Sequence, residues 1–153
     1  MNLSNVNWNA SNVCRFIFPL ILGFVVGALP SCKMSKSSGS IVKFRPPSWV
    51  FGVVWTILYI LFGLAWVISI TTENNIILVD VFYSIITVLL TSWIIVYSCY
   101  KNKRGGIYVL VGCLCAIILA FNVSPLESRL MISPLLAWIV LATLLNTFEV
   151  QNL

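Results

Sequence analysis

The sequence predicts an all-α integral membrane protein, a single bundle of five transmembrane helices. Hydrophobic residues make up 60% of the 153-residue chain and charged residues only 8%, which is too little charge to cover a soluble protein of this size. Its mean hydropathy is +1.03. Apolar runs of spanning length recur five times. Because backbone groups in hydrocarbon must pair within their own segment, we expect each run to be a helix.

Short connections separate the apolar segments, except after the first. The predicted helices span about residues 15–30, 47–70, 76–100, 105–123 and 129–150. The first is near the lower length limit for a span. Pro46 and Pro47 suit the entry of the second, because proline loses no internal hydrogen bond in a first turn. The long connection, 31–46, is rich in Ser, Lys and Gly. We expect one domain over residues 1–153.

Basic residues gather in two of the connections and predict the orientation. The first connection holds Lys33, Lys36, Lys43 and Arg45, and the third holds Lys101, Lys103 and Arg104. The opposite side carries only Arg15 and Arg129. Because basic loops stay on the cytosolic side of a membrane, we expect loop one, loop three and the carboxyl terminus in the cytosol.

The amino terminus carries no clear targeting signal. It has neither the basic start and cleavage site of a signal peptide nor the Arg-rich composition of a transit peptide. We therefore expect the first apolar segment to be retained. In a eukaryotic host these features suit the outer mitochondrial membrane or another cytosol-facing membrane. Since topology accounts for the basic residues, the expected partner is the lipid bilayer and not nucleic acid.

The residues that carry most metal and catalytic chemistry are scarce. The chain has no histidine, and its five cysteines include no C-x-x-C pair, so we expect no metal site and no cofactor. Cys113 and Cys115 lie roughly 200° apart on a helix and cannot join each other. We expect all the cysteines to be small apolar residues of a membrane protein. Asp80 and Glu149 fall near membrane boundaries, which argues against a proton relay.

Aromatic residues and glycines form a stripe on one face of the second predicted helix. At 100° per residue the stripe covers an arc of roughly 100°, and it contains Gly52, Trp55, Tyr59, Phe62, Gly63 and Trp66. Trp49 falls at the membrane interface, where an indole N–H can reach water. A rise of about 1.5 Å per residue places Trp55, Trp93 and Trp138 in the cytosolic half. Helix packing and a pocket for a flat apolar ligand both remain open.

Two motifs resemble the translocator protein family, also called the tryptophan-rich sensory proteins or TspO. In PPSWVFGVVWTILYILFG of the second helix, the matching residues are Pro46, Pro47, Trp49, Trp55, Leu58, Tyr59 and Gly63. In PLLAWIVLATLLN of the last helix, they are Pro134, Trp138, Ala142, Thr143, Leu145 and Asn146. The first helix is similar to the family's glycine-notched one through Pro19, Gly23 and Gly27.

The chain departs from the family pattern at two places that bear on ligands. The family's third helix has an Asn three residues before its Trp and a Pro just after it, where this chain has Leu90 and the run Ile94–Ile95. The family's cholesterol-recognition pattern needs a Tyr and then a Lys or Arg after Leu145. The segment LNTFEVQNL has neither, so we expect cholesterol to bind weakly or not at all.

The resemblance implies a five-helix bundle, often dimeric, that binds tetrapyrroles in a pocket opening toward the first loop. A porphyrin or haem-type ligand would then lie against Trp49, Trp55, Tyr59, Trp93, Trp138, Ala142 and Asn146. Lys43 and Arg45 at the rim would meet its carboxylates. The G-x-x-x-G pair of Gly23 and Gly27 favours a close helix contact, within the bundle or in a homodimer, which another helix face would also allow.

Three functions remain open on the sequence. The first is a membrane receptor or carrier for tetrapyrroles, linked to their transport or sensing. The second is an enzyme that promotes light-dependent porphyrin degradation, in which Trp55 and Trp138 would act. The usual acid–base pairs and nucleophiles are absent, which favours a receptor over an enzyme. The third is a regulatory membrane protein with a sterol or no small ligand.

Overall fold

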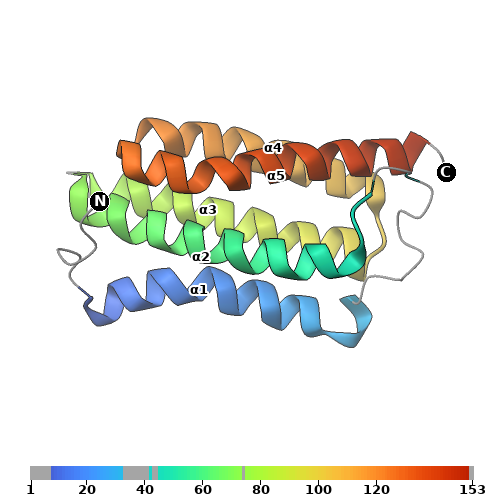
Figure 1. Cartoon of the computed structure of the whole chain (residues 1–153), viewed down its shortest axis with the longest axis horizontal. Coiled ribbons are helices and arrows are strands. Elements are labelled where there is room, and N and C mark those ends of the chain that lie inside the picture. The colour runs from blue at the N-terminus through green and yellow to red at the C-terminus, as the bar shows by residue number, and fades with distance from the viewer. Residues whose placement is uncertain (1–7, 33–41, 43–44, 74, 152–153) are drawn as a thin grey trace.

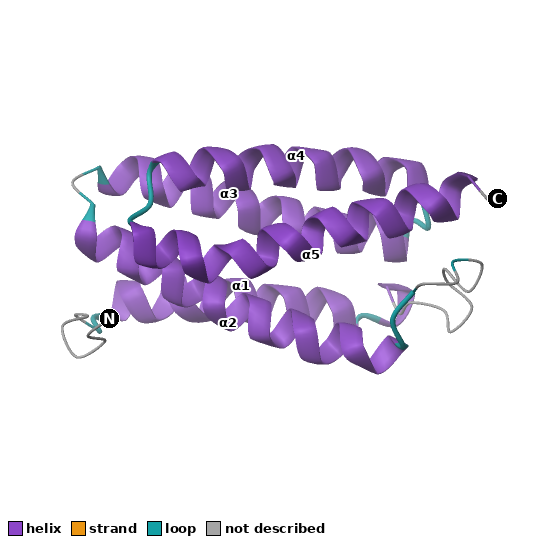
Figure 2. Cartoon of the chain, turned by 45° about the horizontal axis from the view of Figure 1, so that its top comes forward, coloured by secondary structure: helices purple, strands orange, loops and turns teal. Residues whose placement is uncertain are grey.

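The computed structural model describes residues 8–32, 42, 45–73 and 75–151. Its long helices run side by side along one axis (Figures 1 and 2): α1 (Ala10–Ala28), α2 (Ser48–Thr72), α3 (Ile76–Ile94), α4 (Lys103–Asn122) and α5 (Leu126–Gln151). A 3-10 turn, η2 (Pro30–Cys32), follows α1, and a π-helical segment, η3 (Ile95–Cys99), extends α3. All five spans are long and apolar enough to cross a membrane, which confirms the predicted all-α membrane bundle.

Helices α1, α4 and α5 begin earlier than the hydropathy predicts. The Asn9 side chain caps α1 by accepting a hydrogen bond from the Asn12 backbone N–H at 2.8 Å. Asn102 caps α4 in the same way, accepting from the Gly105 N–H at 2.8 Å. Helix α5 also starts early, at Leu126 rather than residue 129, but without a described side-chain cap. Polar capping residues start a helix but lie outside the apolar run, so hydropathy places the boundary too late.

Helix α2 is the most buried of the spans and contacts α1, α3 and α5. Toward its carboxyl end, Phe62 and Trp66 pack on Tyr83 of α3, with ring centroids 5.2 and 5.7 Å apart. The buried Tyr83 hydroxyl hydrogen-bonds with Ser69 and Ser124, each at 3.1 Å. This cluster fills the bundle at the end away from loop one.

Helix α1 lies at the edge of the bundle and is the least buried span (Figure 1). Near its start, Arg15 donates two hydrogen bonds to the Asp80 carboxylate of α3, at 2.8 and 2.7 Å. The Trp66 indole N–H donates to the same carboxylate at 2.8 Å. A bidentate pair fixes orientation as well as distance, so α1 is held to α3 at this end.

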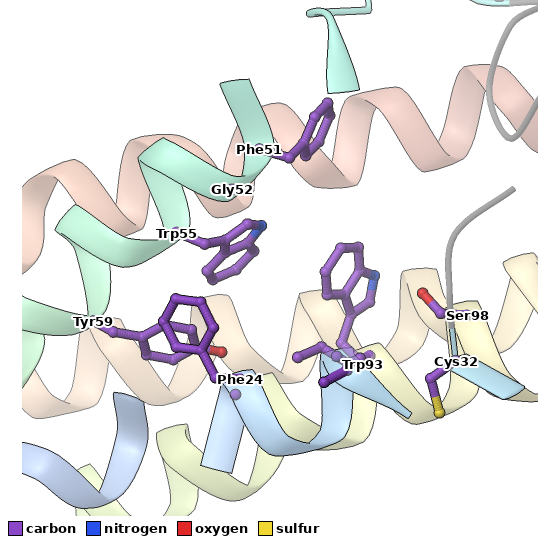
Figure 3. A pocket seen from close by; sticks show the side chains of 12 residues that line it. Phe24, Cys32, Phe51, Gly52, Trp55, Tyr59, Trp93 and Ser98 are labelled. Carbon is purple, nitrogen blue, oxygen red and sulfur yellow. The ribbon is translucent and has the colours of Figure 1, made fainter. Parts of the chain in front are cut away.

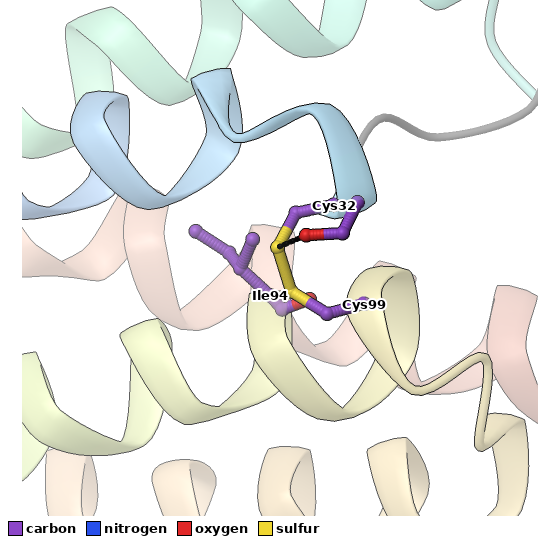
Figure 4. Close-up of a disulfide and its surroundings, with 4 residues drawn as sticks. Cys32, Ile94 and Cys99 are labelled. Atoms are coloured by element: carbon purple, nitrogen blue, oxygen red, sulfur yellow. Dashed lines mark hydrogen bonds between the residues drawn. A yellow bond between two sulfur atoms is a disulfide. The ribbon is translucent and has the colours of Figure 1, made fainter.

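A disulfide joins α1 to α3 at the opposite end. It links Cys32 of η2 to Cys99 of η3 (Figure 4). The expectation that all cysteines are simple apolar residues is therefore wrong for this pair, whose sequence separation of 67 leaves no local motif to reveal it. Cys14, Cys113 and Cys115 are free thiols. Cys113 is buried and Cys115 exposed, in keeping with the opposite directions that their spacing predicts.

Candidate functional site

A cavity of about 380 Å³ lies between α1, α2 and the end of α3 (Figure 3). Its volume is in the range of small-molecule sites. The wall is mainly aromatic and glycine, with Phe24 and Gly27 from α1, Phe51, Trp55 and Tyr59 from α2, and Trp93 from α3. Phe24 is 52% exposed, so the cavity is open on the α1 side.

Trp55 is the centre of the aromatic wall. It stacks on Trp93 with ring centroids 5.7 Å apart and planes 29° apart. Tyr59 lies one turn further along α2, with its ring 5.5 Å from that of Trp55. Trp138 of α5 forms T-shaped pairs with Trp55 and Phe51, with ring centroids 6.5 and 5.5 Å apart. Stacked and edge-to-face pairs are favourable aromatic geometries, and together they hold the rings of this wall in place.

Two glycines of α1 shape the cavity differently. A Cβ at Gly23 would lie 2.6 to 2.8 Å from the Tyr59 ring, so glycine here lets the tyrosine lie between α1 and α2. A Cβ at Gly27 would meet nothing within 4 Å, and this residue borders open cavity. The close contact implied by the G-x-x-x-G pair is made inside the bundle at Gly23, while the homodimer stays a prediction.

A second, smaller cavity of about 20 Å³ lies on the α5 side and shares Phe51 and Trp93 with the first. Unlike the main cavity, it is bordered by charged side chains as well as apolar ones. Its lining includes Arg45, Tyr97, Ala142, Asn146 and Glu149. The Glu149 carboxylate, 1% exposed, accepts a hydrogen bond from the Tyr97 hydroxyl at 2.7 Å and pairs with Lys103 of α4 at 2.7 Å.

The π-helical segment η3 brings several of these groups to the two cavities. Trp93 just before it stacks on Tyr97 within it, with centroids 5.4 Å apart and planes 18° apart. Ser98 lines the main cavity, and Cys99 forms the disulfide. The wider turn of a π-helix changes the direction of successive side chains, and such segments often occur at functional sites.

Comparison with known proteins identifies the family to which this chain belongs. Residues 16–150 match the model of the TspO/MBR family. The chain belongs to the TspO/MBR family. It is 32% identical over 114 residues to the Tryptophan-rich protein TspO of Archaeoglobus fulgidus, and the aligned region covers 67% of this chain and 69% of that relative. Membership supports a receptor or sensor role in a membrane.

The structure of this TspO/MBR member brings together most of the residues that the sequence singled out. Trp55, Tyr59 and Trp93 line the main cavity, and Arg45, Ala142 and Asn146 line the small one with Trp93. Trp138 contacts the aromatic wall from α5. Trp49 lies apart from both cavities with its side chain 70% exposed. Lys43 lies outside the described residues.

Sequence reasoning missed several residues that line the cavities of this family member. Phe24 and Phe51 border the main cavity, and Tyr97 and Glu149 border the small one. Phe51 directly precedes Gly52 of the predicted stripe. A search of the residues next to the stripe would therefore have found it. Glu149 appeared only as a carboxylate near a membrane boundary. Its burial depends on Lys103, which lies on another helix, and no local pattern reveals that pairing.

Proposed function

We propose that this protein is a membrane receptor or carrier that binds a tetrapyrrole in its main cavity, for transport or sensing. The observation that carries the proposal is the aromatic wall formed by Trp55, Tyr59 and Trp93 along an apolar space of about 380 Å³. A porphyrin is a flat apolar ring, and aromatic side chains stack well on such a face. The exposed edge at Gly27 and Phe24 lets a large ring protrude toward the bilayer.

The test is a titration of the detergent-solubilised protein with protoporphyrin in darkness, followed through tryptophan fluorescence. Three of the tryptophans lie in or against the cavity, so a bound porphyrin should quench them saturably. Free tryptophan at the same absorbance corrects for light absorbed by the porphyrin. Quenching that does not saturate, or that equals this control, would contradict tetrapyrrole binding.

A second candidate is an enzyme that degrades porphyrin in light, and the approach of Trp55 and Trp138 to 6.5 Å favours it. Both indoles would border a ring bound in the cavity. Illuminating the same titration tests this candidate. The enzyme would be supported if the natural chain causes the porphyrin absorption band to disappear in light but not in darkness, and if the band persists in light with Trp138→Phe. A band that is stable in light with the natural chain would favour the receptor.

The proposal includes the orientation of the protein and its partners. The end of α1, the start of α2, the α3–α4 turn and the end of α5 lie at one end of the bundle (Figure 1). The bases Lys101, Lys103 and Arg104 belong to that end, and we place it in the cytosol by the positive-inside rule. The host membrane would be the outer mitochondrial or another cytosol-facing membrane if the host is eukaryotic. Homodimerisation and weak or absent cholesterol binding are further parts of the proposal.

A further inference from the structure

Two buried hydrogen-bond donors line the small cavity without a partner. Asn146 is 4% exposed and Trp93 5% exposed, and both side chains border this space. Among the described residues, neither Asn146 Nδ2 nor Trp93 Nε1 has a hydrogen-bond partner. Buried donors are paired in the great majority of native structures, because leaving one unpaired is costly. The cavity is therefore built for a group that accepts hydrogen bonds.

The charges around the small cavity leave a positive excess. Glu149 is already neutralised, since Lys103 pairs with its carboxylate and Tyr97 donates to it. The Arg45 guanidinium lies over the Phe51 ring, 5.2 Å from its centroid. Arg45 and Lys103 are positive and Glu149 is negative, so one positive charge is in excess at this cavity. A cationic, donor-lined space favours an anionic oxygen over a neutral or cationic group.

The size and position of the small cavity fit one end of a larger ligand. Its volume of about 20 Å³ has room for one oxygen-sized group. Phe51 and Trp93 border both cavities, so a group held here can be attached to a ring held in the main cavity. The Asn146 amide also packs closely on α4, where a Cβ at Gly106 would lie 3.2 Å from Asn146 Nδ2. Glycine at this position therefore makes room for the amide.

We propose that the small cavity is a carboxylate subsite that receives one oxygen of an acid group of the ligand. Asn146 Nδ2 and Trp93 Nε1 donate hydrogen bonds to it, and Arg45 supplies the positive charge. The subsite rests on the tetrapyrrole proposal above and adds a requirement to it. A ring that carries a free acid must bind more tightly than the same ring as an ester.

The test compares protoporphyrin with its dimethyl ester, which keeps the ring but has no carboxylate. The natural chain should bind the acid about tenfold more tightly, the worth of one charge-assisted hydrogen bond. Asn146→Leu keeps the side-chain size and every tryptophan, so the fluorescence readout is intact. It should weaken binding of the acid by a similar factor and leave the ester unchanged. Asn122→Leu, at the exposed carboxyl end of α4, is the matched control and should change neither.

A second variant tests the charge and does not disturb the buried amide. Arg45→Gln should also reduce the preference for the acid, while Arg104→Gln removes an exposed charge of the same end and should keep it. Competition with oleate tests whether the subsite takes the acid group of a porphyrin or that of a fatty acid. We expect oleate not to displace protoporphyrin. Displacement would assign the subsite to a fatty acid instead.

The outcomes separate the two proposals. If the natural chain binds acid and ester equally, or if Asn146→Leu weakens both alike, the tetrapyrrole proposal stands and the carboxylate subsite is wrong. If the natural chain binds neither porphyrin, both proposals fail.

Discussion

At the scale of single residues, Trp55 is the side chain on which the proposed ligand site most depends. Its ring contacts those of Tyr59, Trp93 and Trp138. An aromatic contact is worth about 0.5–1.5 kcal/mol beyond area burial, and 1.4 kcal/mol is tenfold in affinity. Trp55→Ala should therefore weaken protoporphyrin binding several-fold in the titration described above. Trp138→Ala should act in the same direction. If neither substitution matters, the ligand binds elsewhere.

Trp66 is the matched control because it lies on the same predicted stripe but not at the cavity. Its side chain is 5% exposed, stacks on Tyr83 and donates to Asp80. Trp66→Ala should lower the thermal midpoint of the detergent-solubilised protein and leave the affinity of the folded fraction unchanged. Circular dichroism at the titration temperature checks that the variants being compared are folded to the same extent. An equal loss of affinity in Trp66→Ala and Trp55→Ala would make the stripe a packing feature.

Helical periodicity predicted the direction of these side chains but not their surroundings. Gly52, Trp55 and Tyr59 face the main cavity, whereas Phe62 and Trp66 on the same stripe face Tyr83 in the core. Spacing fixes the angle at which a residue leaves its helix. The residues that these side chains meet belong to α1 and α3. Contacts between helices cannot be read from the spacing of residues within one helix.

At the scale of whole elements, the approach of α1 to α2 depends on Gly63. A Cβ at this position would overlap the backbone carbonyl oxygen of Phe16. A carbonyl in a helix cannot move alone, so Gly63→Ala must push α1 away from α2. We expect a lower thermal midpoint, although alanine is intrinsically the better helix former by about 1 kcal/mol.

Gly27→Ala is the control for that substitution, on the facing helix. A Cβ there would meet nothing within 4 Å, so only the helix propensity acts, and the midpoint should stay unchanged or rise. Both variants are measured by thermal unfolding in the same detergent. A Gly63→Ala midpoint equal to that of Gly27→Ala would mean that α1 is not packed against α2 as closely as described.

The disulfide is the second restraint on α1, after the Arg15–Asp80 pair. Cross-linking positions far apart in sequence stabilises a fold by about 2–4 kcal/mol in typical cases. Cys99→Ser should therefore lower the thermal midpoint of the oxidised protein measurably. Cys115→Ser, which removes an exposed free thiol, should not. A midpoint that a dithiol reductant lowers in the natural chain but not in Cys99→Ser would confirm the cause, and one unaffected by either change would contradict it.

The five spans were predictable because a bilayer forces any long apolar run into a helix. The restraints on α1 were not. Cys32 and Cys99 are joined across 67 residues, and Arg15 meets Asp80 on another helix. In a sequence these read as isolated small or boundary residues. Similarly, no residue in Ile95–Cys99 distinguishes a π-helical turn from the α-helix that was predicted to continue to residue 100.

At the scale of the whole molecule, two general rules disagree about the end that carries loop one. Lys101, Lys103 and Arg104 favour the cytosol for that end. The disulfide of Cys32 and Cys99 lies at the same end, and disulfides are rare in the reducing cytosol. Both rules hold together if the pair is a dithiol in the cell and oxidises when the protein is purified in air. The redox state in the cell therefore reports the orientation.

We predict that Cys32 and Cys99 are reduced in living cells and that loop one is open to the cytosol. Cells are quenched with acid, denatured and treated with a heavy maleimide, which adds to all five cysteines of the reduced chain but only to the three free ones of the oxidised chain. The two forms then differ in gel mobility, and Cys99→Ser marks a chain that cannot form the bond. In parallel, a protease added to intact organelles should cut residues 33–46 and spare the amino terminus. An oxidised pair together with a protected loop would place the basic end in an oxidising compartment and reverse the orientation.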